Sequence, residues 1–388
     1  MNAKSEAQWR DPKRYLWSLG LLVPLFPVLG ALVYVQTGQI WGWWLTPLIV
    51  YLIIPALDFL IGTDHSNPPE SAVANLEADN YYKYIVYAYI PLQYAGTLIT
   101  VWFACTELGP LGIIAGLFSC AYVNGIGINT GHELGHKRDA FSQFLAKLAL
   151  APVAYGHFYV EHNFGHHRRV ATPEDPASSK MGESFWRFLP RTVIGSLRSA
   201  CEIEAQRLER KGLGFWHWRN DVLQAWAMTL VFFGACTIVL GWMALVFLVV
   251  QAVLGASLLE VINYVEHYGL LRQKDANGRY ERCLPKHSWN SNHIVTNLVL
   301  YQLQRHSDHH AHPSRAFQAL RHFDDSPQLP SGYASMMMLA YFPPLWFKVM
   351  NPRVVAHHRG DFNKANVHPA KIAKLKSYFE TFSKTASA

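Results

Sequence analysis

The chain has 388 residues, of which 16% are charged and 14% are aromatic, and its formal net charge is +7 at pH 7. Soluble globular proteins carry about 25% charged residues, so this composition excludes an ordinary soluble domain and favours a membrane protein. In a membrane protein a positive charge usually reflects basic cytoplasmic loops, so we expect no nucleic-acid partner. The five cysteines are scattered and form no C-x-x-C pair, which argues against disulfides and against thiolate-bound metal.

Six stretches of the chain are long and apolar enough to cross a bilayer, which takes about 20 residues. Four lie within residues 1–136 and two within residues 222–268. They are Leu16–Val35, Ile40–Ile61, Tyr84–Ala104, Leu111–Ile128, Val222–Leu240 and Met243–Ile262. We therefore predict an all-α membrane protein with six transmembrane helices.

The basic residues orient these spans. Lys and Arg occur at positions 4–14, at Lys83, at positions 137–219 and from Arg272 onward, but not in the connections near positions 37–39, 106–110 and 241–242. Positive residues concentrate on the cytoplasmic side of membrane proteins. We therefore expect the N-terminus, the histidine-rich regions and the C-terminus to be cytoplasmic.

The two polar regions, residues 137–221 and 269–388, are expected to form one cytoplasmic cap of helices and loops. Phe141–Val160 is apolar enough to be a seventh span, but crossing there would put basic loops on both sides of the membrane. We predict instead an interfacial helix, or one packed under the bundle.

Nine histidines are the candidate metal ligands. Spacings of three or four positions within each cluster suit helices that present several rings to one place, and His167 would point about 100° away from His166. They are His132 and His136; His162, His166 and His167; His306, His309 and His310; and His267, at the end of the sixth predicted span. One tetrahedral zinc needs at most four ligands, so nine point to two ions. Imidazole suits iron, copper, zinc or nickel.

Four carboxylates lie beside these histidines in the sequence: Glu133, Glu161, Glu266 and Asp308. Metal-bound histidine usually donates its other ring N–H to a carboxylate or carbonyl, so we expect these side chains to support the ligands. His287, His293 and His312 are weaker candidates. Five arginines near the histidines are candidates for attracting an acidic partner: Arg168, Arg169, Arg305, Arg315 and Arg321.

His132-Glu133-Leu-Gly-His136 also matches the H-E-x-x-H signature, in which two histidines bind zinc and the glutamate is the base of a protease. A membrane zinc protease is therefore an alternative. It leaves the other two histidine clusters without a role.

Five motifs resemble those of the integral-membrane alkane 1-monooxygenases, within the histidine-rich membrane desaturases and hydroxylases. These are His132-Glu-Leu-Gly-His-Lys137, Glu161-His-Asn-Phe-Gly-His-His167, Val170-Ala-Thr-Pro-Glu-Asp-Pro-Ala-Ser-Ser179, Asn263-Tyr-Val-Glu-His-Tyr-Gly-Leu270 and Leu303-Gln-Arg-His-Ser-Asp-His-His310. With the six spans, the resemblance covers nearly the whole chain.

The resemblance implies an enzyme of a bacterial-type inner membrane that converts linear alkanes to 1-alkanols with O2 at two non-haem irons. Electrons would come from rubredoxin, which an NAD(P)H-dependent reductase reduces. No flavin or nicotinamide fingerprint occurs in the chain, so we expect neither cofactor to be bound. A related hydroxylase or desaturase acting on fatty-acyl or aromatic-methyl substrates is the alternative.

The substrate would enter an apolar tunnel among the helices, and bulk near Ile49–Ile53 in the second span would limit its chain length.

Overall fold

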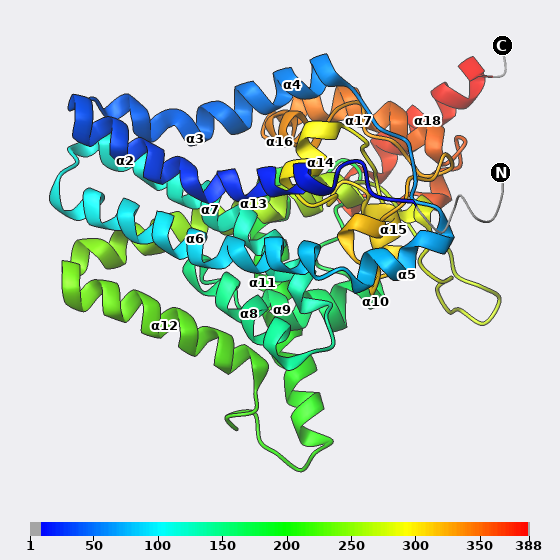
Figure 1. Cartoon of the computed structure of the whole chain (residues 1–388). Helices are drawn as coiled ribbons and strands as arrows, with labels where there is room; N and C mark the ends of the chain where they lie inside the picture. The colour runs from blue at the N-terminus through cyan, green and yellow to red at the C-terminus, as the bar shows by residue number, and fades with distance from the viewer. Residues whose placement is uncertain (1–8, 387–388) are drawn as a thin grey trace.

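The computed structural model describes residues 9–386. Within that range the secondary structure is helical, apart from four isolated β-bridges. Long helices form a bundle, and shorter helices and loops form a cap at one end of it (Figure 1). The all-α prediction is therefore confirmed.

The first two predicted spans together form one helical hairpin. Each of them is built from several helix types. Residues Arg14–Leu25 form a 3-10 helix that continues into α2 (Phe26–Thr37). After a tight turn at Gly38 come a 3-10 turn (Ile40–Trp44), α3 (Leu45–Leu48), a π-helical segment (Ile49–Ile53) and α4 (Ile54–Ile61). Pro55 has no N–H and its ring would clash with an α-helical turn before it, which accounts for the wider π turn there.

Four long helices complete the bundle: α6 (Asn80–Thr106), α7 (Pro110–Gly135), α12 (Asp221–Leu240) and α13 (Trp242–His267). The backbones of α7 and α13 touch at two glycines. A Cβ on Gly125 would lie 2.9 Å from the carbonyl oxygen of Gly255, and one on Gly255 would lie 3.1 Å from that of Ala121. Small residues allow this close approach in membrane bundles. Both helices run toward the cap, so both deliver their last residues to the same place (Figure 1).

Five of the six predicted spans are long and apolar enough to cross a membrane: Arg14–Thr37, Ile40–Ile61, Pro110–Gly135, Asp221–Leu240 and Trp242–His267. The remaining prediction, Tyr84–Ala104, lies within α6. This helix has 27 residues and runs along the bundle beside α7, but it is not among those five (Figure 1). Its helical structure is confirmed, and its membrane crossing is not.

A buried amide network joins α6 to its neighbours. The side-chain amide of Gln93 donates to Asn124 Oδ1 (3.0 Å) and to the carbonyl of Ala149 (3.0 Å). Asn124 in turn donates to Gln251 Oε1 (2.9 Å) on α13, and Gln251 donates to the carbonyl of Pro152 (2.6 Å). Polar bonds of this kind hold helices together where burial of apolar surface provides no driving force.

The stretch Phe141–Val160 does not form a long helix. Ala140–Val153 is an apolar helix that is shorter than a span. It comprises α8 (Ala140–Leu150) and a 3-10 turn. It packs against α6 and α7. Lys147, buried on α8, forms an ion pair with Asp221 at the start of α12 (2.8 Å). The helix is thus too short for a seventh span and lies against the bundle, and its position at a membrane interface stays a prediction.

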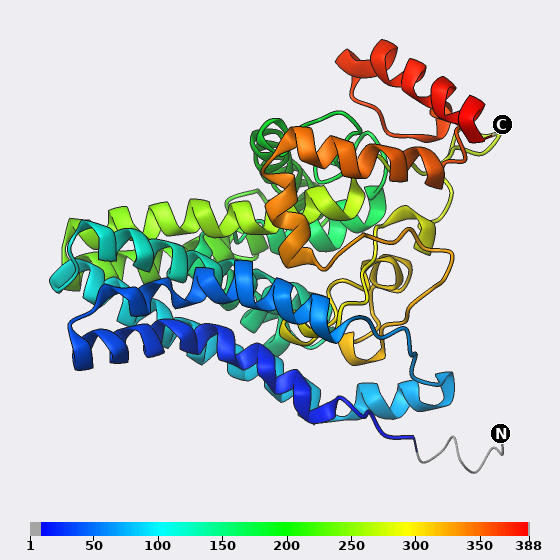
Figure 2. The same cartoon turned by 90° about the horizontal axis from the view of Figure 1, so that it is seen from above.

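The cap consists of helices that follow or interrupt the spans. They are α5 (Glu70–Ala78), α9 (Phe158–Val160), a π-helical segment (Glu161–His166), α10 (His167–Arg169), α11 (Phe185–Glu209), α14 (Ile294–Val299), α15 (His306–Ala311), α16 (Tyr333–Ala340), α17 (Pro343–His357) and α18 (Ile372–Ala386). Short 3-10 turns lie at Pro285–His287, Phe317–Ala319, Phe362–Lys364 and Pro369–Lys371. Figure 2 shows α17 and α18 at the cap end, on the side away from the N-terminal spans.

Arg305 fixes α15 against the rest of the cap. Its side chain is 1% exposed and donates hydrogen bonds to the carbonyls of Asp64 (2.9 Å), Ser66 (2.9 Å) and Leu320 (2.8 Å). The expectation that Arg305 could attract a partner is wrong, because a buried guanidinium engaged by carbonyls is not available at the surface.

The amide network predicts a measurable loss of stability. Asn124→Leu leaves the buried amides of Gln93 and Gln251 without their partner, so we expect the free energy of unfolding to fall by about 1–3 kcal/mol. Thermal unfolding of the purified protein in detergent measures the change. Thr237→Val is the control, because the Thr237 hydroxyl bonds only the carbonyl of Phe233 within α12 (2.7 Å). Equal melting temperatures for the two variants would contradict the role of the network.

Candidate metal centre

The nine histidines meet in the cap as two adjoining groups. The first group contains His132, His136, His162, His167 and His309, and the second contains His166, His267, His306 and His310. Within each group the candidate ligand atoms lie within 4.8 Å of one another. The structure therefore brings together all nine residues singled out from the sequence.

Four segments supply these side chains. His132 lies in the last turn of α7, and His136 directly follows that helix. His267 ends α13, the partner that α7 contacts through Gly125 and Gly255. The π-helical segment with α10 supplies three rings, and α15 supplies the last three.

The π-helical backbone of Glu161–His166 decides which of its histidines pair. In an α-helix, His162 and His166 would share a face and His167 would point about 100° away from His166. In the structure His162 and His167 join the first group, with their Nε2 atoms 2.9 Å apart, and His166 joins the second. A wider turn brings residues five apart into register, and single π turns are frequent at functional sites. In α15 the ordinary spacing holds, since His306 and His310 share one group and His309 turns to the other.

The distances between ring nitrogens test whether metal ions fit. Nε2 of His309 lies 2.9 Å from Nε2 of His132 and 3.1 Å from that of His167. In the second group, Nε2 of His310 lies 2.8 Å from that of His306 and 3.2 Å from that of His166. Bonds of about 2.1 Å to a common ion would separate ligands at right angles by about 3.0 Å. The donor sets therefore fit one ion in each group.

Burial keeps these rings neutral. Outside the spans it lowers the pKa well below its usual value for five of them: His162, His167, His306, His309 and His310. Neutral imidazole offers a lone pair to a metal, whereas imidazolium does not. Among the residues described, Nε2 of His136 and both ring nitrogens of His267 are buried without a hydrogen-bond partner, a cost that a bound ion would offset.

Asp175 is the carboxylate that holds a candidate ligand from behind. Its Oδ2 lies 2.9 Å from Nδ1 of His166 and accepts a hydrogen bond from the Ser178 hydroxyl (2.6 Å). This carboxylate–histidine arrangement orients a ring whose Nε2 faces a metal. Asp175 was not among the carboxylates predicted to support the ligands, although it lies in the Val170–Ser179 motif. Its position in Asp175-Pro-Ala-Ser, shortly after the second histidine cluster, was the available signal.

Three of the four carboxylates expected to support the ligands have other partners. Glu133 binds Lys137 (2.6 Å), Glu161 binds Arg169 (2.7 Å), and Asp308 binds Arg321 (3.1 Å) and His312 (2.9 Å). Glu266 is buried, and its Oε2 lies 3.0 Å from Nε2 of His306, the nitrogen that faces the second group. Glu266 therefore faces the metal side of that ring.

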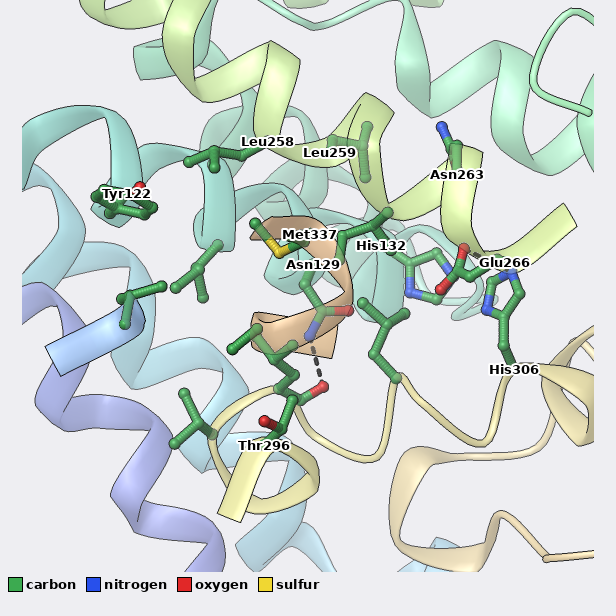
Figure 3. A pocket seen from close by; sticks show the side chains of 18 of the residues that line it. Tyr122, Asn129, His132, Leu258, Leu259, Asn263, Glu266, Thr296, His306 and Met337 are labelled. Atoms are coloured by element: carbon green, nitrogen blue, oxygen red, sulfur yellow. Dashed lines mark hydrogen bonds and ion pairs between the residues drawn. The ribbon is translucent and has the colours of Figure 1, made fainter. Parts of the chain in front are cut away.

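An apolar cavity of about 80 Å³ ends at both groups of histidines. His132 and His162 of the first group line it, and so do His306 of the second group and Glu266. Figure 3 shows Tyr122 and Leu258 at the opposite end, toward the interior of the bundle. Glu133 does not line this cavity, so it is not placed to act as a base for a substrate there.

The amino-acid sequence of this chain is similar to those of several known proteins. The model of the fatty acid desaturase family matches residues 108–340. An alkane 1-monooxygenase of Acinetobacter baylyi is 48% identical over 98% of this chain and 94% of its own length. Alkane 1-monooxygenase 1 of Alcanivorax borkumensis is 47% identical over 95% and 91%. The hydroxylase component of a xylene/toluene monooxygenase from Pseudomonas putida is 27% identical over 62% and 64%.

The grouping of the histidines predicts that two variants will differ in metal content. His309→Ala removes a nitrogen whose Nε2 faces two other rings of the first group, so we expect bound transition metal per chain to fall by at least half. Elemental analysis of purified protein measures it. His312→Ala is the matched control, since His312 follows α15 but belongs to neither group. Full metal content in His309→Ala would remove that residue from the site.

Proposed function

Because the chain belongs to the alkane 1-monooxygenases, within the fatty acid desaturase family, we propose that it hydroxylates the terminal methyl group of linear alkanes. The products are 1-alkanols. The nine histidines would hold two irons, which would supply the activation of O2. The reaction consumes one alkane, one O2, two electrons and two protons, and it gives one alkanol and one water.

The observation that carries this proposal is the apolar cavity that ends at both histidine groups. Aliphatic side chains such as Ile54, Leu258, Ile262 and Leu303 line it, and the histidines and Glu266 stand at one end. A hydrocarbon needs such a lining, because it makes no hydrogen bonds and is held by burial of apolar surface alone.

Iron fits both the chemistry and the donors. Imidazole nitrogen binds iron, copper, zinc and nickel, and oxygen activation needs an ion that changes oxidation state, which zinc does not. The side chains that line the cavity do two further things. They exclude water from the end of the cavity at the histidines, and they place the terminal methyl group of the alkane at that end.

Terminal selectivity must come from position. Methyl C–H bonds are harder to break than methylene C–H bonds, so a freely tumbling alkane would react inside its chain. A narrow cavity that admits only the chain end next to His132, His162 and His306 would present the methyl group first.

We further propose six spans, with α6 as the third, and a cytoplasmic cap. Three short connections, around Gly38, Glu107–Gly109 and Gly241, join the helices at the end away from the cap (Figure 1), and they contain no Lys or Arg. A sixth crossing by α6 is what keeps the basic residues on one side. Its tyrosines have partners inside the bundle: Tyr89 donates to the carbonyl of Val123 (2.9 Å) and Tyr94 to that of Leu148 (2.9 Å).

The electron donor in this proposal is reduced rubredoxin, with its NAD(P)H-dependent reductase upstream. The chain's sequence supports an external donor, because it has no C-x-x-C pair for an internal thiolate-bound iron. Its formal charge of +7 would attract an acidic carrier.

Two alternatives are less well supported. A zinc protease would use Glu133 as a base, but this residue binds Lys137 and lies outside the cavity. An aromatic-methyl or fatty-acyl substrate would share the metal centre, and the relative with a xylene/toluene name is only 27% identical. Product analysis separates these substrate classes.

The test of the proposed function is hydroxylation of octane by the iron-loaded enzyme with O2 and reduced rubredoxin. We expect 1-octanol as the product, with two irons per chain by elemental analysis. His310→Ala should lower the turnover number at least 100-fold, because Nε2 of His310 faces two other rings of the second group. Equal turnover without O2, or with zinc in place of iron, would overturn the proposal.

The position of Val50 predicts that it limits the length of the alkane that the cavity accepts. It lies in the π-helical segment of the second span, is 6% exposed and lines the cavity. Val50→Trp fills part of this space, so we expect kcat/KM for dodecane to fall at least ten-fold relative to that for hexane. Ile53→Trp is the control, since Ile53 is 40% exposed in the same segment and does not line the cavity. An unchanged ratio for Val50→Trp would contradict this role.

A further inference from the structure

The apolar cavity is too small in the described conformation for the substrates proposed above. Its volume is about 80 Å³, whereas a cavity of about 150 Å³ in another protein takes one benzene ring. An octane chain has more carbon atoms than benzene. For such a chain to reach the histidines, the cavity must therefore extend through the end marked by Tyr122 and Leu258.

A second hollow begins at that end. An apolar groove of about 540 Å³ is lined by residues of α7, α13, the start of α11 and the turn after α16. Tyr122 and Leu258 line both the groove and the cavity. The two spaces are thus neighbours that share a wall.

The groove opens on the apolar outside of the molecule. Phe118, Trp186 and Phe342 line it and are 37%, 57% and 59% exposed. The indole N–H of Trp186 donates to the carbonyl of Tyr341 (3.1 Å), so this edge combines aromatic rings with a polar group. Such a combination suits the boundary between hydrocarbon and headgroups, where Trp and Tyr are enriched.

Three tyrosines from different elements meet at the groove side of this wall. Tyr122 lines both spaces, and Tyr51 and Tyr341 line the groove alone. The rings of Tyr51 and Tyr122 make an edge-to-face contact with centroids 5.2 Å apart. The hydroxyl of Tyr51 meets that of Tyr341 at 3.3 Å, longer than the usual range for O–H···O bonds. Tyr122 is 3% exposed. The wall therefore combines one buried ring with a hydroxyl contact that little energy would break.

Tyr51 is better placed to move than Tyr122, because it is only half-buried whereas Tyr122 is 3% exposed. It lies in the π-helical segment Ile49–Ile53, whereas Tyr122 lies inside the regular helix α7. The ring of Tyr341 is held between Phe185 (5.5 Å between centroids) and Trp186 (5.9 Å). A turn of the Tyr51 side chain would separate the two hydroxyls and leave room for movement of Tyr122, the ring that lines both spaces.

We propose that Tyr51, Tyr122 and Tyr341 form a gate between the membrane-facing groove and the cavity, through which the alkane enters and the 1-alkanol leaves. The proposal rests on the proposed function for the identity of the two molecules. The hydroxyls of Tyr51 and Tyr341 would also serve the departing product, because an alkanol can hydrogen-bond to either of them while its chain stays in the groove.

The test blocks the groove and measures passage without turnover. Ser257 lines the groove, and Ser257→Cys labelled with benzyl methanethiosulfonate fills it with an aromatic ring. We expect exchange of 1,1,1-trifluorooctane between bound and free forms, followed by fluorine NMR, to slow at least ten-fold on labelling. A thiol reductant should reverse the effect.

Thr237→Cys on α12, labelled in the same way, is the control, since Thr237 lines neither space. Mass spectrometry confirms labelling of both variants, and labelled wild type corrects for the native cysteines. An exchange rate that labelling of Ser257→Cys leaves unchanged would overturn the gate. Failure of the unlabelled enzyme to make 1-octanol would instead overturn the proposed function, because probe exchange does not depend on hydroxylation.

Tyr51→Phe tests the hydroxyl contact itself. It keeps the ring against Tyr122 and removes the bond to Tyr341, so we expect the probe to exchange at least three-fold faster. Tyr84→Phe is the matched control, since Tyr84 is 61% exposed on α6 and lines neither the groove nor the cavity. Equal exchange in Tyr51→Phe and wild type would overturn the assignment of this contact as the latch.

Discussion

The structure depends on the convergence of nine imidazoles in a space from which water is largely excluded. Neutral rings with their ring nitrogens 2.8–3.2 Å apart cannot all satisfy one another, since each nitrogen pair shares at most one proton. Two cations, one in each group, would satisfy them. The cap is accordingly built around candidate ligands whose burial is costly without metal, and metal binding and folding of this region are expected to be coupled.

The bundle positions this centre by simple means. Gly125 and Gly255 let α7 and α13 touch along their backbones, and the two helices carry His132 and His267 to one end. Arg305 then ties α15 to the loop that follows α4. Three of the segments that supply histidines are thus held by contacts that bind no metal themselves. The same bundle leaves an apolar space beside the histidines. Some of these histidines line that space, so the reacting end of a hydrocarbon would lie against them.

Much of this could be predicted from the sequence, because its signals were local. Apolar length gave the helices, and four-residue spacing placed His132 with His136 and His306 with His310. The separation of His166 from His162 and His167 into different groups could not be predicted. It follows from the π-helical backbone of Glu161–His166, and no residue in that segment is a sequence signal for a π-helix. The partner of His166 was missed because Asp175 reaches it from a separate turn. The second span carried a clearer signal, since Pro55 follows its π-helical segment, yet the consequence for Tyr51 depends on Tyr122 and Tyr341, which are distant in the sequence.

The bundle is also strongly one-sided. Away from the cap, the long helices are joined only by turns of a few residues around Gly38, Glu107–Gly109 and Gly241. Such turns offer almost no surface to a second protein and no room for an inserted regulatory domain. A protein that delivers electrons to the buried histidines would therefore have to bind at the cap, whereas the product proposed above would leave through the groove on the side of the bundle.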